Sequence, residues 1–165
     1  MNKPTKKDAR KAVVFGGSGF LGSHVADALT DEGFQVTIFD RQQSPYLQKQ
    51  QNMVLGDITN LPDILKVMKN VDVVYHFAGI ADINEAKVKP VETITSNILG
   101  TTNILEACRN NNVCRFVFAS TIYVYSELGS FYRSSKQACE LIIENYFDEY
   151  DLNYTILRYG SLYGR

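Results

Sequence analysis

Residues 12–22 read AVVFGGSGFLG, and this stretch decides the fold. Four apolar residues, Ala12 to Phe15, are typical of a short strand that is buried on both faces of a sheet. Glycines follow at three-residue spacing, and a helical pattern of apolar residues begins at Phe20. The sequence therefore predicts a strand, a tight glycine turn and the N-terminus of a helix.

Each of the three glycines has its own physical reason to be in this turn. Gly16 lets the chain turn sharply off the strand, Gly19 has no Cβ to hold a pyrophosphate away from the backbone, and Gly22 lets the helix pack closely on the sheet. The start of the helix presents unpaired N–H groups and a partial positive charge to an anion. We therefore predict a dinucleotide site here, with an ordinary structural turn as the alternative.

The second predicted strand, Gln35–Phe39, leads directly into an acidic residue, Asp40. A carboxylate about twenty residues past the glycines can accept hydrogen bonds from both ribose hydroxyls of adenosine, which favours NAD over NADP. Arg41 follows and could pair with a 2′-phosphate, so NADP remains the alternative cofactor.

Composition and charge indicate an ordinary globular domain. The chain has 165 residues, 45% hydrophobic and 21% charged, and 17 Lys and Arg side chains nearly balance 18 Asp and Glu. A domain of this size can bury a substantial core, and the balance gives no general attraction to nucleic acid or membrane. Residues 1–10 form a basic arm without interleaved aromatic residues, which we interpret as a flexible, solvated terminus. Residues 11–165 are expected to form the cofactor-binding domain.

The cysteines and histidines predict neither a disulfide framework nor a metal site. Cys108, Cys114 and Cys139 form no CxxC pair, which favours reduced, mostly buried thiols in a cytoplasmic protein. His24 and His76 are too few and too dispersed for a metal site, and His76 is interpreted as an oriented side chain at the end of a strand. We expect neither a signal peptide nor a transmembrane segment.

Strands and helices alternate along the rest of the chain. Short apolar runs predict further strands at 53–55, 71–77, 115–119 and 153–158, and helical spacing predicts helices at 91–110 and 131–150. This order predicts a doubly wound parallel sheet of about six strands, with right-handed crossovers and helices on both faces.

A cluster of residues able to carry chemistry follows the fifth predicted strand. That strand ends in Ser120 and Thr121, and the next helix opens with Tyr132 and, four residues later, Lys136. Residues four apart share one helix face, so the Lys136 ammonium can stabilise the Tyr132 phenolate and lower the pKa of the phenol. Such a phenol is a usable proton acceptor near neutral pH, and Thr121 can hydrogen-bond the same substrate oxygen. The same spacing also occurs by chance on helix surfaces.

Three other places near predicted strand ends are candidates for cofactor contact. Asp57 follows the third strand and fits equally well as an adenine contact or as a cap of the next segment. Phe77, Ala78 and Gly79 follow the fourth strand, where small residues let the backbone approach a cofactor. Asn97 falls inside a predicted helix, where asparagine is unfavourable without a partner.

Together these stretches resemble the extended short-chain dehydrogenases/reductases, in particular the NAD-dependent epimerase/dehydratase family that acts on nucleotide sugars. The matching segments cover nearly the whole chain in the family's order: VVFGGSGFLGSHV, TIFDR, GDI, VVYHFAG, SNILGTTNILEAC, FVFASTIYVYS, YRSSK and ILRYGSLYGR. The resemblance implies a Rossmann fold, and it implies that this chain is the N-terminal portion, without the part that binds the sugar nucleotide.

The resemblance also implies two groups of site residues. In the catalytic group, Thr121 orients the substrate, Tyr132 is the catalytic base or acid, and Lys136 lowers its pKa and binds the nicotinamide ribose. Asn97 is implied to join the hydrogen-bond network of the active site. The residues implied to bind NAD lie around the glycine turn and the strand ends: Gly16, Gly19, Phe20, Leu21, Gly22, Asp40, Arg41, Asp57, Ile58, Phe77, Ala78, Gly79, Asn97, Tyr132 and Lys136.

The expected function is epimerisation of a nucleotide sugar through a transient keto-sugar. In this family the base takes a proton from a sugar hydroxyl while hydride passes to the nicotinamide, and an epimerase returns the hydride to the other face. Dehydratases carry acidic residues after the catalytic Ser or Thr, whereas this chain has Ile122 and Tyr123. The alternatives are an NAD(P)-dependent keto reductase and a non-catalytic dinucleotide-binding module. Family members commonly pair as homodimers through helices matching 91–110 and 132–150; the alternative is that both faces merely cover the sheet.

Overall fold

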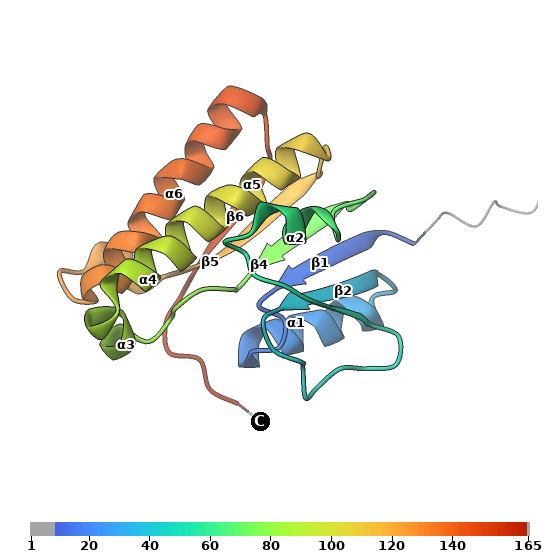
Figure 1. Cartoon of the computed structure of the whole chain (residues 1–165), viewed down its shortest axis with the longest axis horizontal. Coiled ribbons are helices and arrows are strands. Elements are labelled where there is room, and N and C mark those ends of the chain that lie inside the picture. The colour runs from blue at the N-terminus through green and yellow to red at the C-terminus, as the bar shows by residue number, and fades with distance from the viewer. Residues whose placement is uncertain (1–8, 165) are drawn as a thin grey trace, which may run out of the picture.

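The computed structural model describes residues 9–164, which form one six-stranded sheet with helices on both faces (Figure 1). The strand order is β3-β2-β1-β4-β5-β6, and every neighbouring pair is parallel. The strands are β1 (Lys11–Phe15), β2 (Gln35–Asp40), β3 (Asn52–Leu55), β4 (Val73–His76), β5 (Arg115–Thr121) and β6 (Tyr154–Tyr159). The predicted doubly wound parallel sheet is confirmed. Most of the predicted basic arm, residues 1–8, lies outside the described residues.

The helices differ from the prediction mainly in their interruptions. They are α1 (Phe20–Asp31), α2 (Leu61–Leu65), α3 (Ile83–Val88), α4 (Pro90–Ile94), α5 (Gly100–Asn110) and α6 (Ser130–Tyr150), with a π-helical turn η1 (Thr95–Leu99) and a 3₁₀ turn η2 (Ile122–Tyr125). The single helix predicted at 91–110 is therefore α4, η1 and α5 in succession. The short elements α2, α3 and η2 were not predicted, because six residues or fewer show no clear periodicity.

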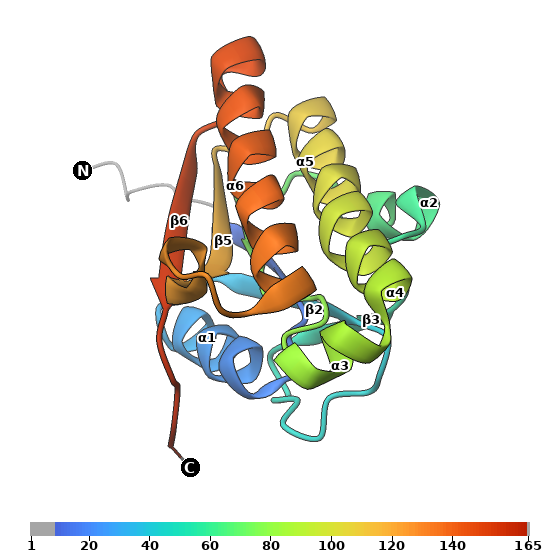
Figure 2. The same ribbon diagram turned by 90° about the vertical axis from the view of Figure 1, so that its left-hand side faces the viewer.

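The sheet separates two hydrophobic cores. Alternate residues of a strand face opposite sides, so Val13 and Phe15 enter one core while Ala12 and Val14 enter the other. The smaller core lies under α1. The larger core lies under α2, α5 and α6, of which α5 and α6 run side by side (Figure 2). Burial of β1 on both faces is what its continuous apolar run predicts.

The carboxyl ends of the strands meet at one edge, and the candidate site lies there. Because all strands are parallel, the glycine turn after β1, Asp40 at the end of β2 and Thr121 at the end of β5 lie along the same edge. The chain leaves β1 toward β2 and leaves β4 toward β5, in opposite directions across the sheet. Such a switch point opens a crevice where doubly wound proteins bind ligands.

Two of the three cysteines and His76 are buried inside the described part of the chain. Cys108 and Cys139 are buried and Cys114 is exposed, and all three are free thiols, in agreement with the expectation of mostly buried thiols. His76 ends β4, bonds through Nε2 to the Thr101 hydroxyl at 2.9 Å, and burial lowers its pKa. Within residues 9–164, no helix has the length and hydrophobicity needed to cross a membrane.

Candidate active site

The glycine turn after β1 is shaped by close backbone approaches. Gly16 has φ +80°, and a Cβ on it would lie 2.5 Å from the backbone nitrogen of Ala78. A Cβ on Gly22 would lie 2.2 Å from the carbonyl oxygen of Gly16. At Gly19, in contrast, the nearest atom to a Cβ would be 3.5 Å away, an ordinary contact distance, and the residue borders a cavity. Gly16 and Gly22 are thus required by packing, and Gly19 leaves room above the turn.

The helix start beside this turn is free to meet an anion. Gly19 caps α1 with no side-chain hydrogen bond, and the first turn of α1 carries no acidic residue. The first amides of a helix have no partner within the helix, and the helix dipole adds a partial positive charge. The arrangement fits a pyrophosphate, whose oxygens would replace the missing acceptors.

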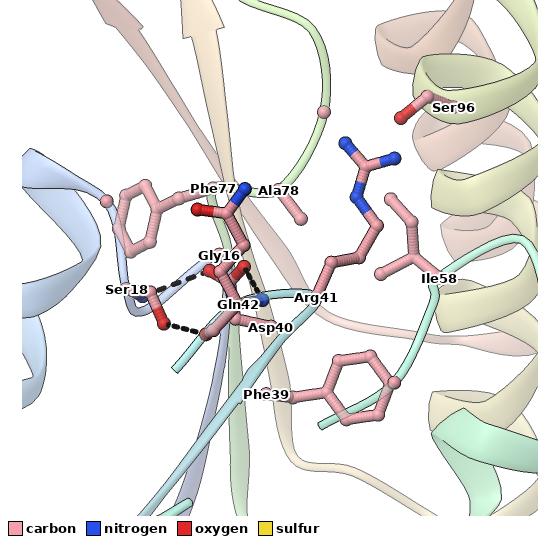
Figure 3. A pocket seen from close by; sticks show the side chains of 13 residues that line it. Gly16, Ser18, Phe39, Asp40, Arg41, Gln42, Ile58, Phe77, Ala78 and Ser96 are labelled. Carbon is pink, nitrogen blue, oxygen red and sulfur yellow. Dashed lines mark hydrogen bonds between the residues drawn. The ribbon is translucent and has the colours of Figure 1, made fainter. Parts of the chain in front are cut away.

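Asp40 is held rigidly at the end of β2. Its Oδ2 accepts from the backbone N–H of Ser18 at 3.0 Å, and its Oδ1 accepts from the backbone N–H of Gln42 at 3.2 Å (Figure 3). The Ser18 hydroxyl in turn donates to the Gln42 carbonyl at 2.8 Å. Each carboxylate oxygen keeps a further lone pair, so Asp40 can still accept from ribose hydroxyls.

A cavity of about 250 Å³ opens between the glycine turn and the ends of β2 and β3. Figure 3 shows the Arg41 side chain extending past Ile58 toward Ser96. The lining residues are Gly16, Ser18, Gly19, Phe39, Asp40, Arg41, Gln42, Gly56, Ile58, Phe77, Ala78, Gly79 and Ser96. Most of the predicted NAD-binding residues on this side of the turn are therefore brought together.

Asp57 and Asn97 lie outside this lining. The Oδ1 atom of Asp57 accepts from both the backbone N–H and the hydroxyl of Thr59, each at 2.8 Å, which stabilises the turn before α2, whose N-cap is Asn60. Asn97 is buried; its Oδ1 accepts from the Ile80 N–H at 2.8 Å, and its Nδ2 donates to the Ile80 carbonyl and the Ser135 hydroxyl. These bonds explain how an asparagine is accommodated inside a helix: it ties the segment after β4 to α6.

A second cavity, of about 340 Å³, lies on the other side of the glycine turn. Its walls include the start of α1, the end of β5 and the first turns of α6. Gly16, Gly19 and Phe77 line both cavities. The complete lining is Gly16, Gly19, Phe20, Leu21, Gly22, Phe77, Ala81, Ile83, Ala119, Ser120, Thr121, Tyr123, Tyr132, Lys136, Tyr159, Gly160 and Leu162. The three predicted catalytic residues thus share one cavity with the helix start.

Tyr132 is partly buried and hydrogen-bonded to Thr121. Burial raises the pKa of its phenol, and the hydrogen bond from the Thr121 hydroxyl opposes this by lowering the pKa. The Lys136 ammonium lies 6.0 Å from the centre of the Tyr132 ring. The lowered pKa expected from the spacing is therefore wrong for this structure: desolvation, which a sequence does not show, outweighs the hydrogen bond from Thr121.

Lys136 is buried with its ammonium pointing back to β5. Its Nζ donates to the Ala119 carbonyl at 2.8 Å and lies 4.5 Å from the centre of the Phe118 ring. Burial lowers the pKa of Lys136 to about 8, although the nearby Cys139 and Glu140 raise it. A lysine this close to losing its proton can exchange protons within the ordinary pH range.

An ion pair one helical turn beyond Lys136 holds α6 against the two strands beside it. Glu140 is 8% exposed and accepts from the Ser120 hydroxyl and, through both oxygens, from the Arg158 guanidinium. Arg158 also donates to the Tyr125 hydroxyl. These bonds connect α6 with β5, β6 and η2.

Several residues of the site were not anticipated. Ser18 lies inside the glycine stretch, so its place in the sequence was a usable signal. Ser96 enters the first cavity from the unpredicted π-helical turn, and Tyr123 and Tyr159 enter the second from η2 and the end of β6. No local sequence pattern indicates these three.

Comparisons with known proteins identify the family of the chain. A model of the NAD dependent epimerase/dehydratase family matches residues 12–165. A UDP-glucose 4-epimerase of Klebsiella pneumoniae is 32% identical over 129 residues, which are 71% of this chain and 93% of that protein.

Solved structures show the same fold over nearly the whole chain. A UDP-glucose 4-epimerase of Thermotoga maritima with UDP-glucose superposes with TM-score 0.88 at 27% identity, covering 93% of this chain and 56% of that one. The enzyme of the same name from Thermus thermophilus, in complex with NAD, superposes with TM-score 0.85 at 30% identity and the same coverage, 93% and 56%. This chain therefore spans about half the length of these solved relatives. By its family match and its identity to these epimerases, the chain belongs to the NAD-dependent epimerase/dehydratase family.

Proposed function

We propose that this chain binds NAD and that the complete protein epimerises a nucleotide sugar through a transient keto-sugar. One observation carries the proposal: Thr121, Tyr132 and Lys136 line a cavity that meets the Asp40 cavity at the glycine turn. An extended dinucleotide crossing the turn would have its adenosine on the Asp40 side and its nicotinamide beside Tyr132.

The residues present fit such a cofactor at each point. The space above Gly19 and the uncapped start of α1 suit the pyrophosphate, with Phe20 and Leu21 contributing backbone amides. Asp40 suits the hydroxyls of the adenosine ribose, and Ile58 forms an apolar wall for adenine. Lys136 would hydrogen-bond the nicotinamide ribose. Arg41 borders the same cavity as Asp40, which keeps NADP as the less favoured alternative.

Tyr132 would remove the proton of a sugar hydroxyl, and Thr121 would hold the same oxygen. Bound NAD would supply a hydride acceptor for the carbon that carries this hydroxyl. The proton goes to the Tyr132 oxygen as the C–O bond becomes a carbonyl, and it returns when the carbonyl is reduced from the other face. The Lys136 ammonium would stabilise the phenolate that begins each cycle.

Calorimetric titration of the chain with NAD and with NADP tests the cofactor. We expect micromolar binding of NAD, weaker binding of NADP, and a loss of about tenfold or more in NAD affinity for Asp40→Ala. Asp31→Ala, an exposed carboxylate at the end of α1, is the matched control and should bind as the unchanged chain does. If neither nucleotide binds, the cofactor assignment is wrong for this chain.

The reaction is tested in a chain extended to the length of the solved relatives, because we propose that sugar-nucleotide contacts come largely from residues beyond these 165. Tyr132→Phe should abolish interconversion of UDP-sugars while the chain still binds NAD in calorimetry. An epimerase leaves the NAD pool unchanged, whereas a keto reductase oxidises NADH in step with product. A non-catalytic module would bind NAD and show neither activity.

We propose that the protein is cytoplasmic, in keeping with its free thiols.

We also propose that its partner is a second copy of the same chain, in a homodimer. Val91 and Leu141 are 73% and 63% exposed on α4 and α6, two helices that contact each other. Such apolar side chains on adjacent helices suit a self-complementary interface. Light scattering should give a dimer mass, and Leu141→Glu should give a monomer that still binds NAD; a monomeric mass for the unchanged chain would contradict the proposal.

A further inference from the structure

Ile58 closes one side of the Asp40 cavity, and α5 holds it there. The residue follows β3, is 6% exposed and lines the cavity beside Arg41 (Figure 3). Its backbone carbonyl accepts a hydrogen bond from Nδ2 of Asn103 at 3.0 Å. The two residues are 45 positions apart in the chain, so this bond ties the loop after β3 to a helix that is distant in sequence.

The side chain of Ile58 rests against Gly100 of the same helix. A Cβ added to Gly100 would lie 2.5 Å from Cδ1 and 2.7 Å from Cγ1 of Ile58, both too close for real atoms. Gly100 is buried and follows the last residue of the π-helical turn. Only a residue without a side chain lets Ile58 lie back against α5 in its present position.

Gly100 and Asn103 act on Ile58 from one face of α5. Residues three apart on an α-helix point the same way, so the glycine contacts the side chain while the asparagine holds the backbone. Ser96, in the preceding π-helical turn, lines the same cavity. Neither Gly100 nor Asn103 lines the cavity itself, and both meet it at Ile58, which does line it.

We infer that Gly100 and Asn103 are positioning residues for the adenine ring of NAD: together they set how far the Ile58 wall stands from the Asp40 side of the cavity. This inference rests on the proposed NAD site. Asp40 places the adenosine ribose, and Ile58 is the apolar surface beside it on which a flat base can pack. If Ile58 moved toward the cavity, the space for the base would be narrower. If Ile58 were held less firmly, it would lose conformational entropy when the base binds, and the affinity would be lower.

A double-mutant cycle on NAD affinity tests the inference. Gly100→Ala should push Ile58 into the cavity, and Asn103→Asp, of the same shape, should set a carboxylate oxygen against the Ile58 carbonyl. Each should weaken NAD binding about tenfold in calorimetry. ADP-ribose should lose the same factor, because it carries the same adenosine half.

The variant Ile58→Ala distinguishes positioning from a general loss of structure. It removes Cδ1 and Cγ1, so Gly100→Ala added to it should change the dissociation constant by less than about twofold. Thr102→Val is the matched control, because it removes a hydrogen bond that stays within the helix, to the Ile98 carbonyl, and should leave NAD affinity unchanged. Melting temperatures of all variants without ligand are measured alongside; alanine favours a helix over glycine, so Gly100→Ala should not unfold the chain.

Additive effects of Gly100→Ala and Ile58→Ala on NAD affinity would overturn the inference while leaving the NAD site itself intact. Equal losses for Thr102→Val would overturn it as well. If the unchanged chain binds no NAD, the proposed function fails, and the adenine role of Gly100 and Asn103 fails with it.

Discussion

Burial of the Lys136 ammonium, which the proposed reaction uses, lowers the stability of the folded chain. The ammonium is buried against Ala119 and Phe118, and this burial lowers its pKa from 10.5 to about 8. Below pH 8 the lysine is protonated in both the folded and the unfolded chain, so folding carries the full cost of burying a cation. Between pH 8 and 10.5 the unfolded chain holds a proton that the folded chain has released, so stability rises with pH in this window.

We therefore predict that Lys136→Met stabilises the chain near pH 7. The pKa shift corresponds to about 3 kcal/mol, and loss of the hydrogen bond to the Ala119 carbonyl removes about 1 kcal/mol of this, leaving a gain of roughly 2 kcal/mol. Urea unfolding at several pH values measures the difference. The advantage of the variant should shrink as pH rises above 8; a constant difference across pH would show that charge burial is not its source.

The hydroxyl of Thr121 is the group that opposes the raised pKa of Tyr132. Thr121→Val removes this donor with little change of shape, so we expect the pKa of Tyr132 to rise further. Carbon-13 labelled tyrosine and NMR titration measure it, with Tyr132→Phe used to assign the signal. An unchanged or lower pKa in the valine variant would mean that the hydrogen bond does not favour the phenolate.

At the scale of elements, the π-helical turn η1 joins α4 and α5, which follow one another as a single interrupted helix. Both α4 and α5 contact α6, and after the turn α5 also contacts α2 and brings Gly100 against Ile58. Asn97 sits in the turn and holds the segment after β4 through two hydrogen bonds to Ile80. Turns of this type often occur at functional sites, where they redirect side chains within a continuous helix.

Asn97→Ala should destabilise the chain by about 3 kcal/mol, since it removes three hydrogen bonds and leaves the Ile80 backbone without these partners. Denaturant unfolding measures the loss, and hydrogen exchange at the Ile80 amide should accelerate more than at amides of β1. Asn110→Ala, exposed at the end of α5, is the control with little expected effect. Equal destabilisation by both variants would contradict this role of Asn97.

At the scale of the whole molecule, the first cavity draws its walls from segments that follow β1, β2, β3 and β4. A ligand that contacts all of these segments stabilises only the folded sheet, because the unfolded chain does not bring them together. At a free NAD concentration a hundredfold above its dissociation constant, the expected stabilisation is about 2.7 kcal/mol.

This stabilisation should raise the melting temperature by roughly 5 to 10 °C. Differential scanning calorimetry with and without NAD measures the shift, and Asp40→Ala at the same NAD concentration should show a much smaller one. A shift equal for both proteins would indicate that the nucleotide binds somewhere other than the Asp40 cavity.

The site was predictable where it depends on strand ends and helix spacing. The glycine turn, Asp40 and the Tyr132–Lys136 pair follow short-range rules, and parallel pairing then brings strand ends to one edge. Asp57 could not be decided from sequence, because capping and adenine contact need the same residue at the same place. The wrong pKa direction for Tyr132 has a similar cause, since desolvation depends on neighbours from other elements.

The sequence by itself determined the parallel sheet, its glycine turn and the edge at which the site lies, because periodicity, glycine conformation and connection order are local properties of the chain. Only the tertiary structure decided the π-helical turn, the contact of Gly100 with Ile58 and the Glu140–Arg158 pair. The two contacts join residues from separate elements, and Asn97 in the turn bonds to the segment after β4 and to α6. The energy of all three comes from close packing and from the removal of water, which exist only once the elements have assembled.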